Sequence, residues 1–148
     1  MWTEARNAYK FKGTNPVITH SPCQQWSKLK AFAKHDQLSK DLSHFCFQRV
    51  LDNGGIFEHP AGSSFFRSVG VASKVVSIDQ FWWNHQVRKR TYLYFNGCKP
   101  LQTPLRLYQK CRDFDNLTKF QRNNTPIDFA AWLTSCIYTS DLNPDYNG

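Results

Sequence analysis

Cys23 is the residue of this sequence that is best placed to carry out chemistry. It stands in a Pro-Cys-Gln turn at residues 22–24, directly after the short apolar run 16–19. A cysteine at the carboxyl end of a strand, where a helix is expected to begin, occupies the position at which nucleophiles and ligand contacts collect in open α/β sheets. We therefore take Cys23 as the first candidate for a site residue.

Polar residues that could act in catalysis also follow the other expected strands. If the strands lie side by side in one sheet, these residues gather at one edge: His20, Cys23, Glu58, His59, Asp79 and His85. Thiol, carboxylate and imidazole groups supply nucleophiles and acid–base catalysts, so the catalytic candidates of an enzyme are Cys23, Glu58 and His59. No metal site is predicted, because the sequence has no paired ligand motif such as Cys-x-x-Cys.

The segment 81–92 interleaves aromatic and basic residues and is the best candidate for ligand binding. Exposed tryptophan rings stack on bases, worth about 1–3 kcal/mol per base, while arginine and lysine neutralise phosphate. The alternative is that one tryptophan packs into the core and the basic run is a solvated turn. The predicted ligand-binding residues are His20, Gln24, Asp79, Trp82, Trp83, His85, Gln86, Arg88, Lys89 and Arg90.

Strand and helix patterns alternate along the chain, which is typical of an α/β fold. The expected strands cover residues 17–19, 56–57, 75–78 and 91–95. The expected helices cover residues 24–34 and 38–52 and a third segment that opens with Thr125 as N-cap and Pro126 at its first position. Residues 101–120 are expected to form a loop with short helical pieces.

Length and composition predict one domain over residues 1–148, with an N-terminal extension at 1–14 and a polar tail at 141–148. Nineteen Lys and Arg against eleven Asp and Glu give a net charge of +8, which suits a nucleotide or nucleic acid partner. The alternative is a generically basic soluble protein. Five scattered cysteines predict a reducing, cytoplasmic location without disulfides. Because no apolar stretch is long enough for a signal peptide core or a membrane span, neither export nor a membrane partner is expected.

Four segments resemble DNA cytosine-5 methyltransferases in order and local context, across residues 15–135. The family has a PCQ turn after a strand, a glutamate triplet after the next strand, QxRxR before a hairpin strand and RxxTPxE at a late helix. The matching segments here are 22–24, 58–60, 86–90 and, as RxxTPxD, 122–128. The chain also resembles a group of small tailed-phage proteins of unsettled activity, through the Pro-Cys turn, a GGxxEHPAxS segment at 54–63 and a DQxxxGHxxRK-like segment at 79–89.

The methyltransferase resemblance implies a role for each matching residue. Cys23 would be the thiolate that adds to C6 of an extruded cytosine. Glu58 would hydrogen-bond or protonate N3 of that base, and Arg88 and Arg90 would hold the base or phosphates. The implied fold is a truncated Rossmann-like domain with a small mixed sheet of four or five strands flanked by helices.

The sequence departs from the family where the cofactor should bind. Only 22 residues precede Cys23, their single glycine is Gly13, and no glycine-rich turn for S-adenosylmethionine is present. The late GNxV element is also missing, and the segment between Arg90 and Arg122 is too short for a target-recognition domain. We therefore expect no cofactor and no autonomous methyl transfer. Glu58 is followed by His59 rather than the asparagine of the family.

These features together predict a phage-encoded, degenerate methyltransferase-like protein in the cytoplasm of a bacterial host. It is expected to bind a nucleobase-containing ligand, either a small or cyclic nucleotide or DNA, and so to counter host defence. One alternative is an enzyme, either a nucleotide-cleaving hydrolase or one half of a split cytosine-5 methyltransferase. Another alternative is a protein-binding inhibitor that docks on a host protein. The chain is also expected to be able to form a homo-oligomer.

Overall fold

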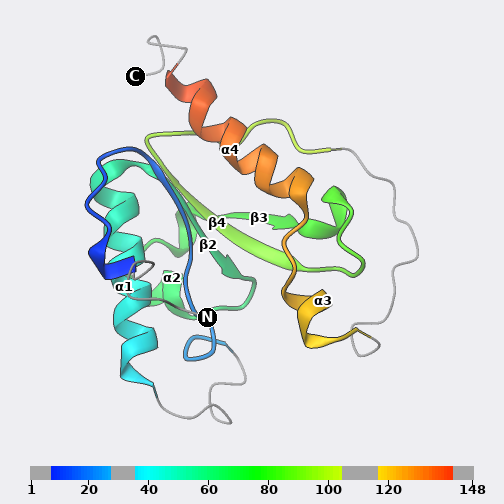
Figure 1. Cartoon of the computed structure of the whole chain (residues 1–148), viewed down its shortest axis with the longest axis horizontal. Coiled ribbons are helices and arrows are strands. Elements are labelled where there is room, and N and C mark those ends of the chain that lie inside the picture. The colour runs from blue at the N-terminus through cyan, green and yellow to red at the C-terminus, as the bar shows by residue number, and fades with distance from the viewer. Residues whose placement is uncertain (1–7, 28–35, 105–116, 142–148) are drawn as a thin grey trace.

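The computed structural model describes residues 8–27, 36–104 and 117–141, which form a mixed α/β domain around one four-stranded sheet (Figure 1). The strands are β1 (Val17–His20), β2 (Gly55–Pro60), β3 (Val76–Asp79) and β4 (Arg90–Asn96). The α-helices are α1 (Gln37–Asn53), α2 (Phe65–Ser68), α3 (Lys119–Asn123) and α4 (Ile127–Asp141). Short 3-10 helices cover η2 (Ala8–Lys10), η4 (Ala72–Lys74) and η5 (Gln80–Trp83).

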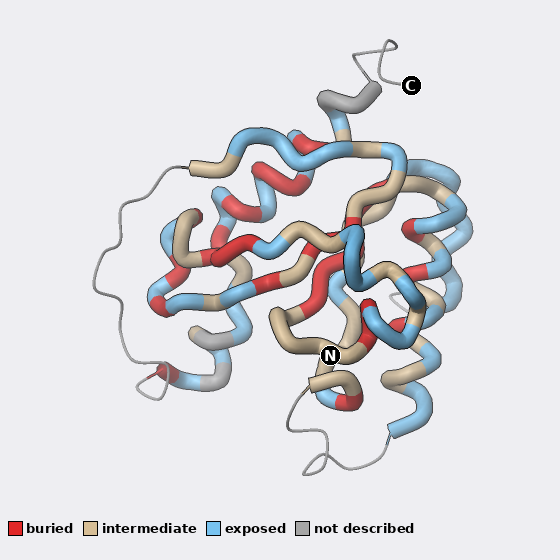
Figure 2. Tube along the Cα trace, turned by 180° about the vertical axis from the view of Figure 1, so that it is seen from behind, coloured by how far each residue is buried: buried red, intermediate tan, exposed pale blue. Residues whose placement is uncertain are grey.

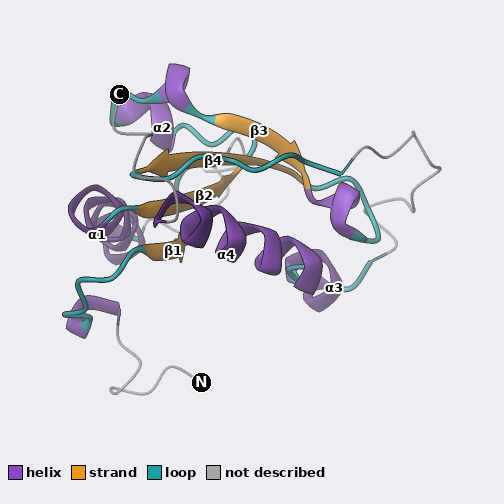
Figure 3. Cartoon of the chain, turned by 90° about the horizontal axis from the view of Figure 1, so that it is seen from above, coloured by secondary structure: helices purple, strands orange, loops and turns teal. Residues whose placement is uncertain are grey.

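The sheet is mixed and has the strand order β1-β2-β4-β3, which Figure 3 shows from above. β1 and β2 are parallel, whereas β4 is antiparallel to both β2 and β3. Strands β1, β2 and β3 therefore run in the same direction. Their last residues, together with the first residues of β4, lie at one end of the sheet, which we call the carboxyl end.

Helix α1 connects the two parallel strands, and its ends are defined by local chemistry. Asp36 caps the helix by accepting a hydrogen bond from the Ser39 backbone N–H at 3.3 Å. At the other end, Gly54 has φ of 77° and Gly55 has φ of 120°, which favour glycine. A Cβ on Gly55 would lie 2.0 Å from the Val17 carbonyl oxygen, so only glycine allows β1 and β2 to start side by side.

Each face of the sheet carries its own apolar cluster, because side chains alternate along a strand. Ile56 and Leu93 pack with the α4 residues Phe129 and Leu133 on one face. Phe57 packs with Phe47 of α1, and with the α2 residues Phe65 and Phe66, on the other. Figure 2 shows the buried residues concentrated along the strands and on the inward sides of the helices. We call the two sides the α4 face and the α1 face.

Most predicted elements are confirmed, with differences at their ends. The four strands and the helix over 38–52 are present, although β2 continues through Glu58 to Pro60 instead of ending at Phe57. The expected helix over 24–34 is a turn in its described part, residues 24–27, and its remainder lies outside the described residues. Helix α4 begins at Ile127, so the prediction of Pro126 as its first residue was wrong by one position.

Other predictions are tested only in part. Residues 101–104 have no regular structure, residues 105–116 and 142–148 lie outside the described ranges, and Thr118 caps α3 through a capping box with Gln121. Within the described ranges, none of the helices has the length and apolar character needed to cross a membrane.

Candidate functional site

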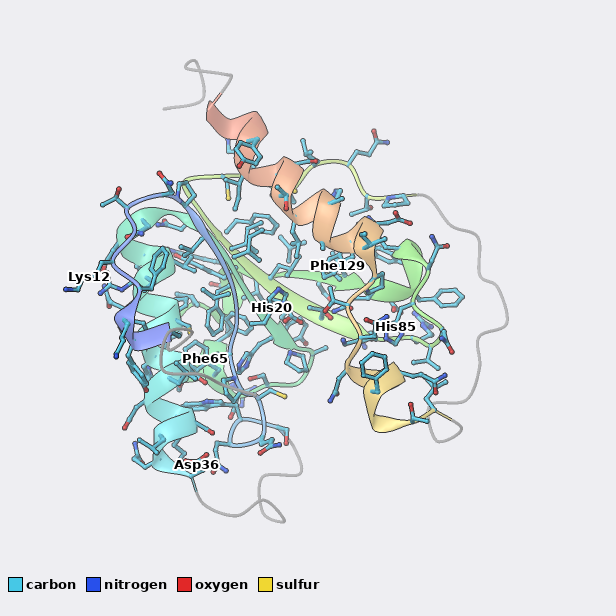
Figure 4. The ribbon with its side chains drawn as sticks, viewed as in Figure 1. Lys12, His20, Asp36, Phe65, His85 and Phe129 are labelled. Atoms are coloured by element: carbon cyan, nitrogen blue, oxygen red, sulfur yellow. The ribbon has the colours of Figure 1, made fainter. Side chains whose placement is uncertain are left out.

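The carboxyl end of the sheet brings together His20 and Glu58, which are 38 residues apart in sequence. They are register partners on β1 and β2, and the His20 Nδ1–H donates to Glu58 Oε2 at 2.5 Å. The Glu58 side chain is only 11% exposed, whereas that of His20 is 43% exposed. Figure 4 labels His20 near the centre of the view. Near the carboxyl end of β2, the nearly buried carboxylate of Glu58 is therefore hydrogen-bonded to His20, whose side chain is partly exposed.

Cys23 and Lys89 complete the group around Glu58. Burial raises the pKa of the Cys23 thiol, the negative charge of Glu58 raises it further, and the positive charge of Lys89 lowers it. Burial lowers the pKa of Lys89, while Glu58 and Cys23 raise it. The charges of Glu58 and Lys89 thus act on the Cys23 thiol, and the site role of Cys23 and Glu58 stays a prediction. We call His20, Cys23, Glu58 and Lys89 the Glu58 group.

The raised pKa of Cys23 leads to a prediction about its reactivity. Because the thiolate is the reactive form, a raised pKa lowers its population at neutral pH. At pH 7.5 we expect iodoacetamide to alkylate Cys23 at least about threefold more slowly in the folded protein than in urea. Peptide mass spectrometry of time points would measure the rate at this cysteine. Faster alkylation of Cys23 in the folded state would contradict the prediction and restore a nucleophilic role.

Lys89 belongs to the Glu58 group because of the register of β4. Leu93 lies opposite Glu58 and Thr91 lies opposite Pro60, and alternation places Lys89 in the same row on the α4 face. Its Nζ donates to the Asn124 carbonyl oxygen at 3.3 Å, in the segment between α3 and α4. The residue between the two arginines of the QxRxR-like segment therefore lies on the same face of the sheet as the buried carboxylate.

The arginines of that segment lie elsewhere. Arg88 is half-exposed and its Nε donates to Asp79 Oδ2 at 2.9 Å. Asp79 is 2% exposed and also accepts from the backbone N–H groups of Lys89 at 2.9 Å and Phe81 at 3.1 Å. Arg90 is exposed and is the register partner of Asp79, on the α1 face. Asp79 and Arg88 therefore shape the turn that carries Lys89, and their predicted ligand contacts find no support in this geometry.

His59 is placed away from Glu58, although the two residues are adjacent in sequence. It is fully buried on the α1 face, where its ring lies 5.2 Å from that of Phe57 and 5.4 Å from that of Phe65. Its Nε2 is hydrogen-bonded to Ser21 Oγ at 2.9 Å and its Nδ1 to Ser63 Oγ at 2.7 Å. Burial lowers the pKa of His59 to about 4, so the ring is neutral near pH 7. This histidine links the turn after β1 to the loop before α2.

The two tryptophans predicted to stack on a base are part of the protein's own packing. They lie on the 3-10 helix η5 rather than on a strand, so the expected alternation does not apply. Trp83 is 4% exposed, with its ring centroid 4.9 Å from that of Trp132. Trp82 is half-buried against the same apolar cluster. Stacking on a ligand by Trp83 was therefore a wrong prediction.

Four buried polar side-chain atoms lack a hydrogen-bond partner among the described residues: Thr19 Oγ1 near the end of β1, Arg49 Nε on α1, Gln80 Oε1 and His85 Nε2. Gln80 Nε2 donates to Thr91 Oγ1 at 3.0 Å, which places this amide on the α4 face. The His85 ring contacts the Val87 backbone through its other nitrogen, Nδ1. Buried polar atoms without partners are uncommon and mark places for water or a ligand. Sequence reasoning missed Gln80, which lies between Asp79 and the aromatic residues 81–83 and within the DQxxxGHxxRK-like segment 79–89.

The remaining predicted residues add little to the site. Gln24 and Gln86 are exposed. Among the described residues, no group of three or more His, Cys, Asp or Glu side chains could hold a metal ion.

Fold and site together define a mixed α/β domain with a partly buried acid–base group at the carboxyl end of its sheet. Comparisons with protein-family models, with curated proteins and with solved structures find no match. The Rossmann-like methyltransferase architecture expected from the resemblance therefore stays a prediction.

Proposed function

We propose that this protein binds a nucleobase-containing ligand, a nucleotide or DNA, at the Glu58 group. The observation that carries the proposal is the nearly buried Glu58 carboxylate at the carboxyl end of parallel strands, beside Cys23 and Lys89. Ligands of open α/β sheets bind outside the carboxyl ends of the strands. A carboxylate and an ammonium group can hydrogen-bond the polar edge of a base.

The charge of the chain supports the phosphate part of such a ligand. The net charge is +8, and the basic residues 88–90 adjoin the same end of the sheet. Long-range attraction of this kind raises the local concentration of anionic ligands and weakens with added salt. The proposed ligand thus has its base at Glu58 and its phosphate toward the basic surface.

The chemistry of Cys23 favours binding of the ligand without its chemical conversion. A thiol with a raised pKa is a poor nucleophile at neutral pH. Together with the resemblance to small tailed-phage proteins, this supports a degenerate methyltransferase-like binder that counters host defence by sequestering a nucleotide in the bacterial cytoplasm.

The direct test is a binding measurement on the full chain and on Glu58→Ala. Native mass spectrometry against mononucleotides, cyclic dinucleotides, ADP-ribose and single-stranded DNA should detect at least one ligand. Loss of the carboxylate should weaken that ligand about tenfold or more, since a buried partner is then left unpaired. Asp52→Ala, which removes an exposed carboxylate on α1, is the matched control and should bind as the wild type does.

Two results would reject the proposal. The first is the absence of binding to the whole panel, together with no salt-dependent binding to DNA. The second is unchanged affinity in a Glu58→Ala protein whose thermal unfolding shows it to be folded.

A further inference from the structure

We propose that His20 accepts a phosphoryl group at Nε2 from a donor with a phosphorus–nitrogen bond, while the Glu58 carboxylate holds the imidazole ring in its reactive form. This inference goes beyond the proposed function, because it assigns a covalent step to a side chain that the sequence predicted only to contact a ligand.

Glu58 fixes the ring of His20. The two residues are register partners on β1 and β2, and the His20 Nδ1–H donates to Glu58 Oε2 at 2.5 Å. In a neutral imidazole, one nitrogen carries the proton and the other carries the lone pair. Because the carboxylate holds the proton on Nδ1, the lone pair is on Nε2. A carboxylate partner of this kind also orients the ring and makes its other nitrogen more basic.

The second nitrogen of His20 is available for reaction. The side chain is 43% exposed, although its Nδ1 is bound to a carboxylate whose own side chain is only 11% exposed. Within the described ranges, Nε2 has no hydrogen-bond partner. Since the ring contacts Glu58 through Nδ1, the lone pair on Nε2 is directed away from that carboxylate. His20 therefore combines an oriented ring with an accessible nucleophilic atom.

The other described histidines do not have this combination. His59 is fully buried, and His85 is 5% exposed. His44 on α1 is exposed and packs on the rings of Trp26 and Phe65. No carboxylate of the described residues is hydrogen-bonded to His44. His44 is therefore an internal reference for an exposed histidine without a carboxylate partner.

The charge of the chain favours a phosphoryl group over a neutral acyl group. Histidine is one of the side chains that form covalent intermediates, and its nitrogen can attack either kind of donor. A net charge of +8 attracts anionic reagents. A phosphoryl group is negatively charged both on its donor and after transfer, so the same field favours the donor and the product.

The proposed step exchanges one phosphorus–nitrogen bond for another, and nothing is oxidised or reduced. With phosphoramidate as the donor, the Nε2 lone pair bonds to phosphorus while the bond from phosphorus to the amino nitrogen breaks and ammonia leaves. The ring becomes positively charged as the new bond forms, and the adjacent Glu58 carboxylate stabilises that charge. The Nδ1 proton then passes through Glu58 to the ammonia, which leaves as ammonium.

Incubation of the full chain with potassium phosphoramidate near neutral pH tests the proposal. We expect His20 to be phosphorylated about tenfold or more faster than His44 in the same molecule, because only His20 has the carboxylate partner. Peptide mass spectrometry under alkaline conditions would measure the rate at each histidine. Phosphorus NMR of the intact protein would identify the isomer, which should be the Nε2 form.

Variants separate the effect of the carboxylate from that of exposure. Glu58→Gln keeps the size of the side chain but removes its charge, so the rate at His20 should fall about tenfold while the rate at His44 stays unchanged. His20→Gln should lose the fast phase of phosphorylation. Asp52→Ala, which removes an exposed carboxylate on α1, is the control that should react as the wild type does. Circular dichroism would show that each variant is folded.

Three results would each overturn the proposal. They are equal rates at His20 and His44, phosphorylation of His20 at Nδ1, and an unchanged rate at His20 in a folded Glu58→Gln protein. The first two are measured on the wild type and do not depend on any variant. No nucleotide is present in these reactions, so their outcome is independent of the binding measurements that test the proposed function.

Discussion

Replacing Asp79 with alanine is expected to lower the free energy of unfolding by about 3 kcal/mol or more. The carboxylate is 2% exposed and accepts hydrogen bonds from two backbone N–H groups and from Arg88 Nε. Its removal leaves the N–H groups of Phe81 and Lys89 without this partner, at a cost of about 1–3 kcal/mol for each buried group. Urea unfolding followed by circular dichroism would measure the loss.

Two further substitutions show which hydrogen bonds of Asp79 matter. Asp79→Asn keeps an acceptor oxygen for both backbone N–H groups, so it should lose less stability than alanine. Arg88→Gln removes an ion pair whose arginine side chain is 53% exposed, and should cost below about 1 kcal/mol. An Asp79→Ala protein within about 0.5 kcal/mol of the wild type would contradict the prediction, since such small effects belong to surface positions.

Acidification from pH 6.5 to pH 4 is expected to remove about 3 kcal/mol of stability through His59. Its pKa is lowered from 6.5 to about 4 in the folded state by burial, and each pKa unit corresponds to about 1.4 kcal/mol. Between these two values the unfolded chain binds the proton more tightly than the folded protein does. The free energy of unfolding therefore falls as the pH falls through this window.

Variants without a titratable group at this position isolate the effect. His59→Gln and His59→Phe should both show a flatter dependence of the free energy of unfolding on pH between 6.5 and 4. Ser63→Ala removes one hydrogen-bond partner but keeps the imidazole, so it should lower stability by about 1 kcal/mol and retain the wild-type pH dependence. Denaturant titrations at several pH values provide the measurement. Equal slopes in His59→Phe and the wild type would show that another group governs acid stability.

The sequence predicted where the candidate site lies in the fold, but not which residues form it. Strand ends followed by polar residues indicated His20, Cys23 and Glu58 together, and the parallel pairing of β1 and β2 brings these three close. Adjacent residues then separate, because β2 continues through Pro60 and alternation sends Glu58 to the α4 face and His59 to the α1 face. The extent of β2 depends on its pairing with β4, which no local pattern contains.

The pairing of β4 also decides which residue of the basic segment 88–90 lies on the face of Glu58. The sequence predicted Arg88, Lys89 and Arg90 alike as ligand contacts, and of the three only Lys89 lies on the same face of the sheet as Glu58. Within an extended strand every second residue lies on the same side, and the side is decided by the register with the partner strand. A shift of one residue would have exchanged the roles of lysine and arginine.

The amino-acid sequence by itself determined the strands, helix α1, the glycines at its end and the charge that suits an anionic ligand. These features depend on neighbours a few residues apart, through periodicity, capping and backbone freedom. Only the tertiary structure decided that Lys89 lies on the same face as Glu58, that His59 and Trp83 are packing residues and that Gln80 carries a buried oxygen without a described partner. The reason is that sheet face and burial are set by strand register and by helices from distant parts of the chain.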